Sequence, residues 1–329
     1  MEIINYNKSL HNKIIDFNKQ AFPLRKGVEA SFDRRFYANI AGNYIEKTYY
    51  VVDEKTQEVF GQFLIMANHF YYQQKKYEGG WGFDFIIDEK LRGQKKGKIL
   101  AEKVMKTPNY CVLGVSKASE HLHYKLGNKK VGEAFRYIRF LNLLSPTRLI
   151  FKKSDFDKYK VSYPETIKAN KMSFKRITYV HQLPDKPYWN ENKLEWDRSA
   201  EFLKWRFFEK ENKYAFYISE GKNEYFVVRK VRWRNLNVLL LVDYRYNGGK
   251  VFENMYKMVL KIAKKTDCSA VISLSSNQEE QAFLKRKMNI KFGDSLLVMT
   301  TCKEVGNVKE ASVTFADSDA DNFYGDNIW

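Results

Sequence analysis

The sequence predicts an α/β fold, of the α+β kind, built from two similar units in tandem. Residues 81–105 combine a strand-like apolar run, a short basic loop and an amphipathic helical run. Residues 110–142 then give a strand, a helix and a second strand. Finally, an Arg-Phe pair followed by an apolar hairpin occurs twice, at Arg35-Phe36 and Arg206-Phe207.

The first unit begins with segments that favour a helix and then a hairpin. A helical stretch is expected near residues 9–22, followed by the "FDRRF" segment of residues 32–36. Residues 48–66, "TYYVVDEKTQEVFGQFLIM", alternate strand-forming residues around a polar turn at residues 53–58. This part of the chain therefore predicts two antiparallel strands.

The segment "WGFDFIIDEKLRGQKKGKILAEKVM" predicts a phosphate-binding turn. An aromatic-rich strand leads through a loop with two glycines into a helix marked by Leu100, Ala101 and Val104. The first N–H groups of such a helix have no partner within the helix, and the helix dipole favours an anion there. Gly93 and Gly97 allow close approach of the backbone to a ligand.

Two common phosphate loops are excluded by spacing. In a P-loop, Ser or Thr must follow the lysine and the glycines lie farther apart, whereas Ile99 follows Lys98 in this chain. The G-x-G-x-x-G dinucleotide pattern is also absent. Neither an NTPase nor a Rossmann-type dehydrogenase is expected.

The next segment predicts a strand, a capped helix and another strand. "YCVLGVS", residues 110–116, is apolar and rich in β-branched residues. Ser116 is placed to cap the following helix, and Gly127 is placed to end it. A strand is expected over residues 132–140.

The second half of the chain repeats this order without the basic loop. "YAFYISEGKNEYFVVRKV", residues 214–231, predicts a hairpin, and residues 268–276 predict a strand like the one that ends at Ser116. Where the first unit has "RGQKKGK", the second has Gly248-Gly249 within residues 243–255. Four of the six prolines lie between Ser145 and Pro187. The expected domains are residues 1–145, a linker at 146–187, and residues 188–329.

Composition excludes several classes of protein. With 44% hydrophobic residues the chain is not largely disordered, and three cysteines are too few for a disulfide framework or a zinc site. The N-terminus has no apolar signal segment and no run is long enough for a membrane span, so a soluble cytoplasmic protein without membrane insertion is expected. The net charge of +18 suits either nucleic acid or a polyphosphorylated small molecule.

The basic loop resembles the pyrophosphate-binding signature of the GNAT acyltransferases, Q/R-x-x-G-x-G/A. Arg92 takes the first position and Gly97 the last, while Lys95 stands where the middle glycine is expected. "LHYKLGN", residues 122–128, resembles the second family signature, "LYEKLGF". The resemblance covers residues 30–142 well and implies two tandem GNAT-like units, each with a mixed, largely antiparallel sheet flanked by helices.

The resemblance implies acetyl-CoA, or another short acyl-CoA, as co-substrate, bound in the first unit alone. In the family, the strand before the loop separates from its neighbour and pairs with the pantetheine arm. The second unit then shapes the acceptor site or caps the first. The residues implied in cofactor binding are Phe85, Ile86, Ile87, Arg92, Gly93, Gln94, Lys95, Lys96, Gly97, Lys98 and Ser116.

The implied reaction is direct attack of an acceptor amine on the thioester in a ternary complex. Asp84, eight residues before Arg92, is a candidate to orient or deprotonate the acceptor, or else it pairs with a basic residue. The family's proton donor for the thiolate corresponds to His123, and Tyr124 would replace it if the helix register shifted by one. His121 faces another side of this helix, so no metal site is expected.

Tandem units with one working site resemble acyltransferases of bacterial surface-polysaccharide biosynthesis, a group that the "FLKWRF" and "ADSDADNF" segments also resemble. That likeness implies a small-molecule acceptor such as an amino sugar or nucleotide sugar. Two alternatives stay open: a transferase that takes its acyl group from aminoacyl-tRNA, as cell-wall peptide-bridge enzymes do, and a non-catalytic RNA-binding module. Salt-sensitive RNA binding would favour either alternative. The oligomeric state is open.

Overall fold

The protein consists of two compact units in a computed structural model. The first comprises residues 1–133, 191–197 and 296–311, and the second comprises residues 134–190, 198–295 and 312–329. The described residues are 1–25, 27–142, 146, 161–209, 213–234, 236–308 and 310–317. The predicted linker at 146–187 and the "ADSDADNF" segment, residues 316–323, therefore lie only partly within the described residues.

The first unit contains a mixed sheet in the order β1-β2-β3-β4-β5-β14. All neighbours are antiparallel except β4 and β5, which run parallel. Its strands are β1 (Glu2–Asn5), β2 (Tyr49–Val52), β3 (Val59–Tyr72), β4 (Lys75–Ile87), β5 (Tyr110–Leu113) and part of β14 (Ile290–Thr300), with β9 (Leu194–Trp196) beside β3. Its helices are α1 (His11–Ala21), α2 (Val28–Phe36), α3 (Lys96–Val104), α4 (Lys117–Lys125) and the short η1 (Lys8–Leu10), η2 (Ile45–Lys47) and η3 (Glu89–Leu91).

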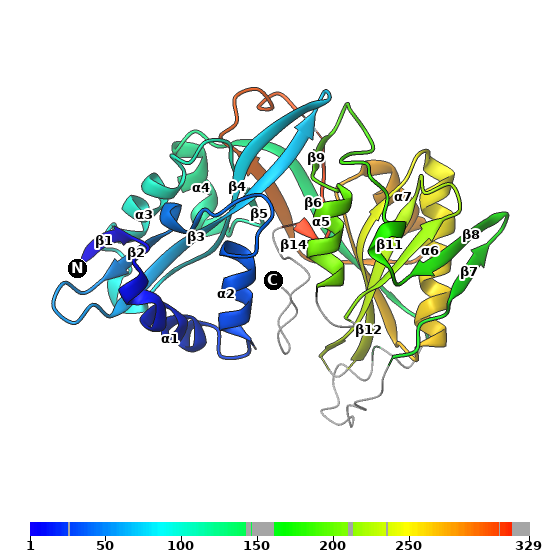
Figure 1. The fold of residues 1–329 in the computed structure, drawn as a ribbon, viewed down its shortest axis with the longest axis horizontal. Helices are drawn as coiled ribbons and strands as arrows, with labels where there is room; N and C mark the ends of the chain where they lie inside the picture. The colour runs from blue at the N-terminus through cyan, green and yellow to red at the C-terminus, as the bar shows by residue number, and fades with distance from the viewer. Residues whose placement is uncertain are drawn as a thin grey trace. The chain divides into compact units, whose positions relative to one another are not determined.

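Helices cover both faces of this sheet because its strands alternate their buried side chains (Figure 1). Phe63 and Ile65 of β3 pack with Leu100 and Val104 of α3 in one core. Leu64, between them, packs with α1 and α2 in a separate core. The predicted hairpin at residues 48–66 is confirmed as β2 and β3, and the predicted core positions of α3 are buried.

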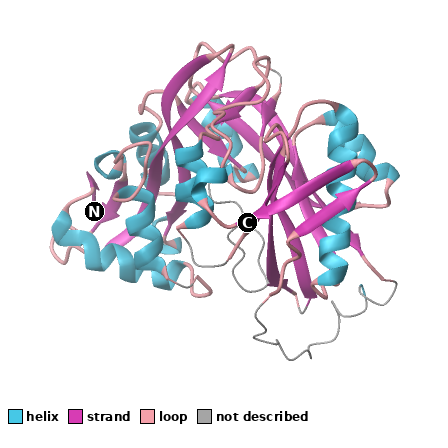
Figure 2. Ribbon diagram, turned by 45° about the vertical axis from the view of Figure 1, so that its right-hand side comes forward, coloured by secondary structure: helices cyan, strands magenta, loops and turns pink. Residues whose placement is uncertain are grey.

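The second unit repeats this plan, with the sheet order β6-β13-β12-β11-β10-β8-β7 and a single parallel pair, β12 with β13. One large core joins its sheet to α6 and α7. Figure 2 shows the helices in cyan and the strands in magenta. The strands are part of β6 (Lys129–Phe140), β7 (Thr166–Ala169), β8 (Met172–Ile177), β10 (Ala215–Ser219), β11 (Tyr225–Trp233), β12 (Leu236–Arg245) and β13 (Ala270–Ser275), with β15 (Ala311–Ser312) at the unit boundary. The helices are η5 (Val180–Gln182), α5 (Ala200–Leu203), η6 (Lys204–Phe208), α6 (Gly249–Lys265) and α7 (Gln278–Arg286).

The ends of α4 and α7 show that the two units are copies of one design. Ser116 and Asn277 each cap the first turn with a side-chain oxygen. After each helix an asparagine, Asn128 or Asn289, donates backbone and side-chain hydrogen bonds to a carbonyl of the last turn. The residue before that asparagine has positive φ in both, 83° at Gly127 and 58° at Met288.

The division of the chain differs from the predicted contiguous domains. The strand after α4, β6, pairs with β13 in the second unit over residues 135–140. The strand after α7, β14, pairs with β5 in the first unit over residues 298–300. A proline-rich stretch marks a break in regular structure, but it carries no information about which sheets the strands before and after it join.

The centre of the second unit contains a fully buried ionic cluster. The Arg198 guanidinium lies 2.9 Å from Asp243 Oδ2 and 2.8 Å from Asp317 Oδ1, and all three side chains are at most 1% exposed. Tyr225 and Thr314 hydroxyls also donate to Asp243, each at 2.7 Å. This cluster ties the late segment 312–317 to the core of the unit. In the part of the chain that the structure describes, no helix is long and apolar enough to cross a bilayer.

Candidate acyl-donor site in the first unit

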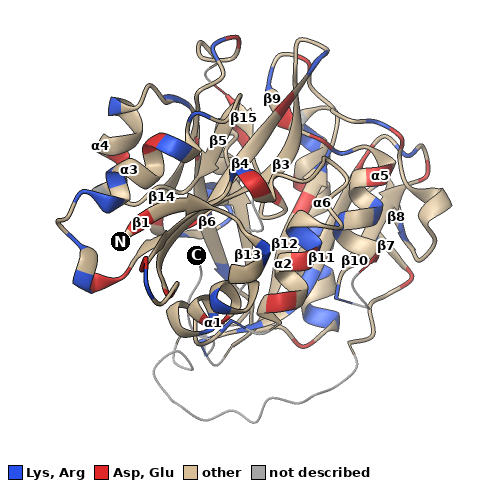
Figure 3. Ribbon diagram, turned by 60° about the vertical axis from the view of Figure 1, so that its left-hand side comes forward, with Lys and Arg blue, Asp and Glu red and all other residues tan. Residues whose placement is uncertain are grey.

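The basic loop lies between β4 and α3, as predicted. Asp88 caps the short turn η3, and α3 begins at Lys96 with no side chain capping its first N–H groups. Arg92, Lys95 and Lys98 are exposed around this end, and the Lys and Arg positions of the loop are among those coloured blue in Figure 3. A helix N-terminus with free N–H groups inside a basic loop is suited to a phosphate group.

Lys95 occupies the position that the family pattern gives to glycine. Its backbone is in the left-handed region, which explains why glycine is preferred at this position. It has φ = 59°, and Gly93 two residues earlier has φ = 82°. A side chain in the left-handed region costs about 1–2 kcal/mol relative to glycine. The loop therefore keeps the left-handed turn that glycine would favour, at some cost in backbone energy, and it gains one more positive charge from Lys95.

The strand β4 separates from β5 directly before this loop. The two strands pair only through Gly80–Gly82 and Tyr110–Val112. β4 continues to Ile87, whereas β5 ends at Leu113 and the chain turns at Gly114, with φ = 77°. Phe83–Ile87 therefore pair with β3 alone among the described residues, which leaves one edge of β4 open for an extended ligand.

A β-bulge at Asp84 lies in the open part of β4. The register with β3 shifts between Gln62 and Leu64, and Asp84 has φ = 48°. Phe63 and Phe85 stack with ring centroids 4.5 Å apart. A bulge bends the strand and redirects its side chains, and bulges are common beside active sites.

The Asp84 carboxylate is held by two arginines. Arg25 Nη2 donates to Oδ1 at 2.9 Å, Arg25 Nη1 pairs with Oδ2, and Arg35 Nη1 lies 3.5 Å from Oδ2. The three side chains are 7–13% exposed. The pairing with basic residues that the sequence left open is present, and it occupies the oxygens that a general base would need free.

The helix register places His123 inside and Tyr124 outside. His123 is 1% exposed and its ring lies 6.1 Å from that of Tyr110, whereas Tyr124 is 44% exposed. Burial lowers the pKa of His123 to about 4, with a smaller opposing effect of Asn128. The imidazolium form that the sequence analysis considered as proton donor is therefore scarcely populated at pH 7.

Tyr110 is a candidate that the sequence reasoning missed. It is fully buried, and its hydroxyl finds no hydrogen-bond partner among the described residues. A Cβ at Gly82 would lie 2.4 Å from that oxygen, so the hydroxyl fills the space beside Gly82 where β4 and β5 part. Only the pairing of β4 with β5 brings the two residues together, and no local pattern around Tyr110 marks it.

The predicted loop residues Arg92 to Lys98 and the strand residues Phe85 to Ile87 are adjacent in the first unit. Ile87 Cγ1 and the Phe85 ring would lie 3.5–3.6 Å from a Cβ at Gly97. Ser116 is occupied as the cap of α4. Within the described ranges, no group of three or more His, Cys, Asp or Glu side chains is placed to hold a metal ion.

Among the solved structures with similar folds, three are named as N-acyltransferases or as a probable N-acyltransferase. A GCN5-related N-acetyltransferase from Anabaena variabilis matches with a TM-score of 0.60 and 12% identity, over 91% of this chain and 72% of that one. The protein has the GNAT fold. N-myristoyltransferase from Saccharomyces cerevisiae, solved with bound myristoyl-CoA, matches at 0.59 and 13%, over 91% and 82%. A probable N-acyltransferase from Enterococcus faecalis matches at 0.58 and 10%, over 92% and 72%.

These matches rest on structure alone. No protein-family model matches the sequence, and no curated protein matches it either.

Because the GNAT fold is present, the open edge of β4, its bulge and the loop before α3 can be compared with their counterparts in the second unit. There β12 also bulges, between its pairings with Val227 and Val228, but the buried Asp243 follows the bulge.

Proposed function

We propose that the protein is an acyl-CoA-dependent N-acyltransferase whose donor site is the first unit. The observation that carries this proposal is the open edge of β4 at Phe83–Ile87, which leads directly into the uncapped, basic N-terminus of α3. Pantetheine amides would pair with the open edge, and the pyrophosphate would bind the free N–H groups of Lys96 and Gly97. Backbone N–H groups near the bulge would then stabilise the oxyanion.

The acceptor is proposed to be a small amine that approaches from the side of Asp84. With its oxygens engaged by Arg25 and Arg35, Asp84 would orient the acceptor rather than take its proton. Phe83 and Phe85 each stack on another ring, and their bulk favours a short acyl group such as acetyl. An amino sugar of surface-polysaccharide biosynthesis fits the group resemblance of the sequence.

The first test is calorimetric titration of the full chain with acetyl-CoA. We expect saturable binding in the micromolar range, about −8 kcal/mol, followed by release of CoA when acceptor amines are supplied. Coenzyme A without an acyl group and a short RNA serve as parallel titrants. No binding of either CoA species would overturn the proposal, and salt-sensitive RNA binding in its place would support the tRNA-dependent alternative.

Tyr110 is proposed to donate a hydrogen bond to the departing thiolate, and the ring of His123, 6.1 Å from that of Tyr110, would hold the phenol in place. Burial raises the pKa of Tyr110 well above its usual value, so the phenol stays protonated and can donate a hydrogen bond. An unsatisfied buried hydroxyl costs about 1–3 kcal/mol, and native structures keep few of them. A thioester sulfur bound beside Gly82, where β4 and β5 part, would give this hydroxyl a hydrogen-bond partner.

Tyr110→Phe is therefore expected to lower the turnover of acetyl-CoA about tenfold while leaving the protein as stable as wild type or up to about 1 kcal/mol more stable. Urea unfolding and release of the CoA thiol measure the two effects. The matched control is Tyr217→Phe, because the Tyr217 hydroxyl donates to Pro164 O at 2.7 Å. That control should lose about 1 kcal/mol of stability and keep its activity. If Tyr110→Phe turned over acetyl-CoA as fast as wild type, the hydroxyl would have no role in catalysis.

A further inference from the structure

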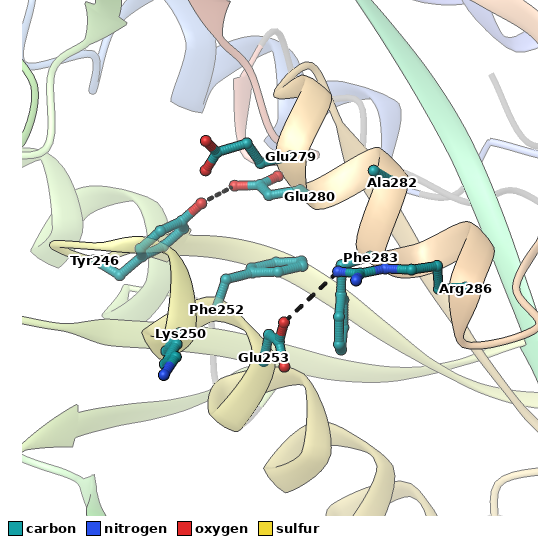
Figure 4. A pocket seen from close by; sticks show the side chains of 9 residues that line it. All are labelled: Tyr246, Lys250, Phe252, Glu253, Glu279, Glu280, Ala282, Phe283 and Arg286. Atoms are coloured by element: carbon teal, nitrogen blue, oxygen red, sulfur yellow. Dashed lines mark hydrogen bonds and ion pairs between the residues drawn. The ribbon is translucent and has the colours of Figure 1, made fainter.

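The second unit contains a cavity of about 560 Å³ at the place that corresponds to the donor site of the first. It lies between the start of α6, which matches α3, and the helix α7, which matches α4 (Figure 4). Its lining residues are Tyr246, Lys250, Phe252, Glu253, Glu279, Glu280, Ala282, Phe283 and Arg286.

The floor of the cavity is rigid and aromatic. Phe252 and Phe283 are 2% and 4% exposed, and their rings meet edge to face at 5.8 Å. The buried Glu280 accepts hydrogen bonds from the hydroxyls of Tyr244, Tyr246 and Ser275 at 2.5–2.6 Å. This network fixes the Tyr246 ring beside Phe252, with centroids 5.7 Å apart. The cavity is thus preformed rather than a gap between loose side chains.

The lining of the cavity carries more acidic than basic side chains, whereas the loop before α3 in the first unit is basic. Three glutamates face two basic residues, although the whole chain carries +18. Arg286 is paired with Glu253 at 3.9 Å, and Figure 4 shows the Lys250 ammonium directed away from Glu279 and Glu280. The exposed Glu279 carboxylate has no side-chain partner among the residues described in this unit.

The N–H groups at the starts of α6 and α7 favour an anion, but three glutamates beside those two helix ends outweigh this effect, so the lining favours a cation over a polyphosphate. The phosphates of CoA would meet Glu253 and Glu279 at the rim in place of the basic residues of the first unit. An ammonium group would gain a carboxylate partner at Glu279, and its apolar body would cover the rings of Phe252 and Tyr246. The aromatic faces attract the same sign of charge as the carboxylate does.

We propose that this cavity is a binding site for a small organic cation, an ammonium group on an apolar or aromatic body. The site is separate from the donor site in the first unit and does not depend on the function proposed for it.

The test uses 2-phenylethylammonium as probe, with 2-phenylethanol and phenylacetate as its neutral and anionic counterparts. Calorimetry or ligand-observed NMR on the full chain should show binding of the ammonium at least tenfold tighter than that of either counterpart. Equal binding of the alcohol, or tighter binding of phenylacetate, would overturn the proposal. So would the absence of saturation at high millimolar probe.

Two variants assign the binding to the cavity. Glu279→Gln removes the charge at an exposed position and should weaken the ammonium at least fivefold. Ala282→Trp fills the cavity from an exposed position of α7 and should abolish binding. Glu220→Gln, exposed in the β10–β11 turn of the same unit, is the matched control and should change nothing. Wild-type affinity in both cavity variants would place the cation elsewhere, in the acceptor site for example, and refute this assignment.

Discussion

Replacing Asp243 by asparagine is expected to lower the free energy of unfolding by about 3–5 kcal/mol, the usual cost of removing one partner from a buried ion pair. Asp243 is 0% exposed and receives Arg198 at 2.9 and 3.2 Å. Arg245 adds a contact at 3.3 Å. Without the carboxylate, two buried guanidinium groups lose their shared counter-charge, although Asp317 still lies beside Arg198.

Urea unfolding of the variant and wild type at pH 7 measures this loss. Asp185→Asn makes the same chemical change at an exposed position of the second unit and should shift stability by less than about 0.5 kcal/mol. A loss below 1 kcal/mol in Asp243→Asn would mean that the cluster contributes little to the stability of the fold.

The same cluster predicts how stability depends on pH. Burial raises the pKa of Asp243, but the ion pairs with Arg198 and Arg245, with hydrogen bonds from Arg198 and Thr314, outweigh this effect and hold the pKa below its usual value. A depressed carboxyl pKa stabilises the folded state above the unfolded pKa of about 4, and the contribution is lost as pH falls through the folded value. Wild type should therefore lose stability steeply below pH 4, and Asp243→Asn less steeply.

Reversing the charges of Lys95 and Lys96 to glutamate is expected to weaken acetyl-CoA binding about a hundredfold, near 2.7 kcal/mol. Both residues flank the first N–H groups of α3, where the proposed pyrophosphate would lie. Two carboxylates there would repel the phosphates and oppose the helix dipole. Because Lys95 is exposed, the loss should shrink at high salt.

The matched control is Lys75→Glu with Lys76→Glu, at the exposed first two positions of β4. It changes the net charge equally and should bind acetyl-CoA as wild type does. Calorimetry at low and high salt separates a local effect from a general one. If both double variants lost the same affinity, the loop would have no special part in binding and only the overall positive charge of the chain would matter.

Local sequence signals predicted the elements that local chemistry controls. Ser116 caps α4 and Gly127 ends it at positive φ, as their residue types required. The hairpins predicted over residues 48–66 and 214–231 are present as β2 with β3 and β10 with β11. The basic loop enters α3 at the expected place because a glycine-bearing turn and an amphipathic run leave few other conformations.

Long-range pairing decided what these signals could not. Tyr110 became a candidate only when β5 was placed beside Gly82, and Arg25 reached Asp84 from 59 residues away in sequence. The sequence could not show that His123 is buried. Burial lowers its pKa from the usual 6.5 to about 4, which leaves little imidazolium at pH 7 to act as a proton donor.

The sequence alone determined that the chain contains two related α/β units and that one of them has a basic turn at a helix N-terminus. Only the tertiary structure showed that β6 pairs with β13 in the second unit and that β14 pairs with β5 in the first. Only the tertiary structure also showed that one edge of β4 is open and that the equivalent place in the second unit is a cavity lined by acidic and aromatic residues. The physical reason is that caps and turns depend on neighbours in sequence, whereas strand partners and burial depend on residues that are distant in sequence.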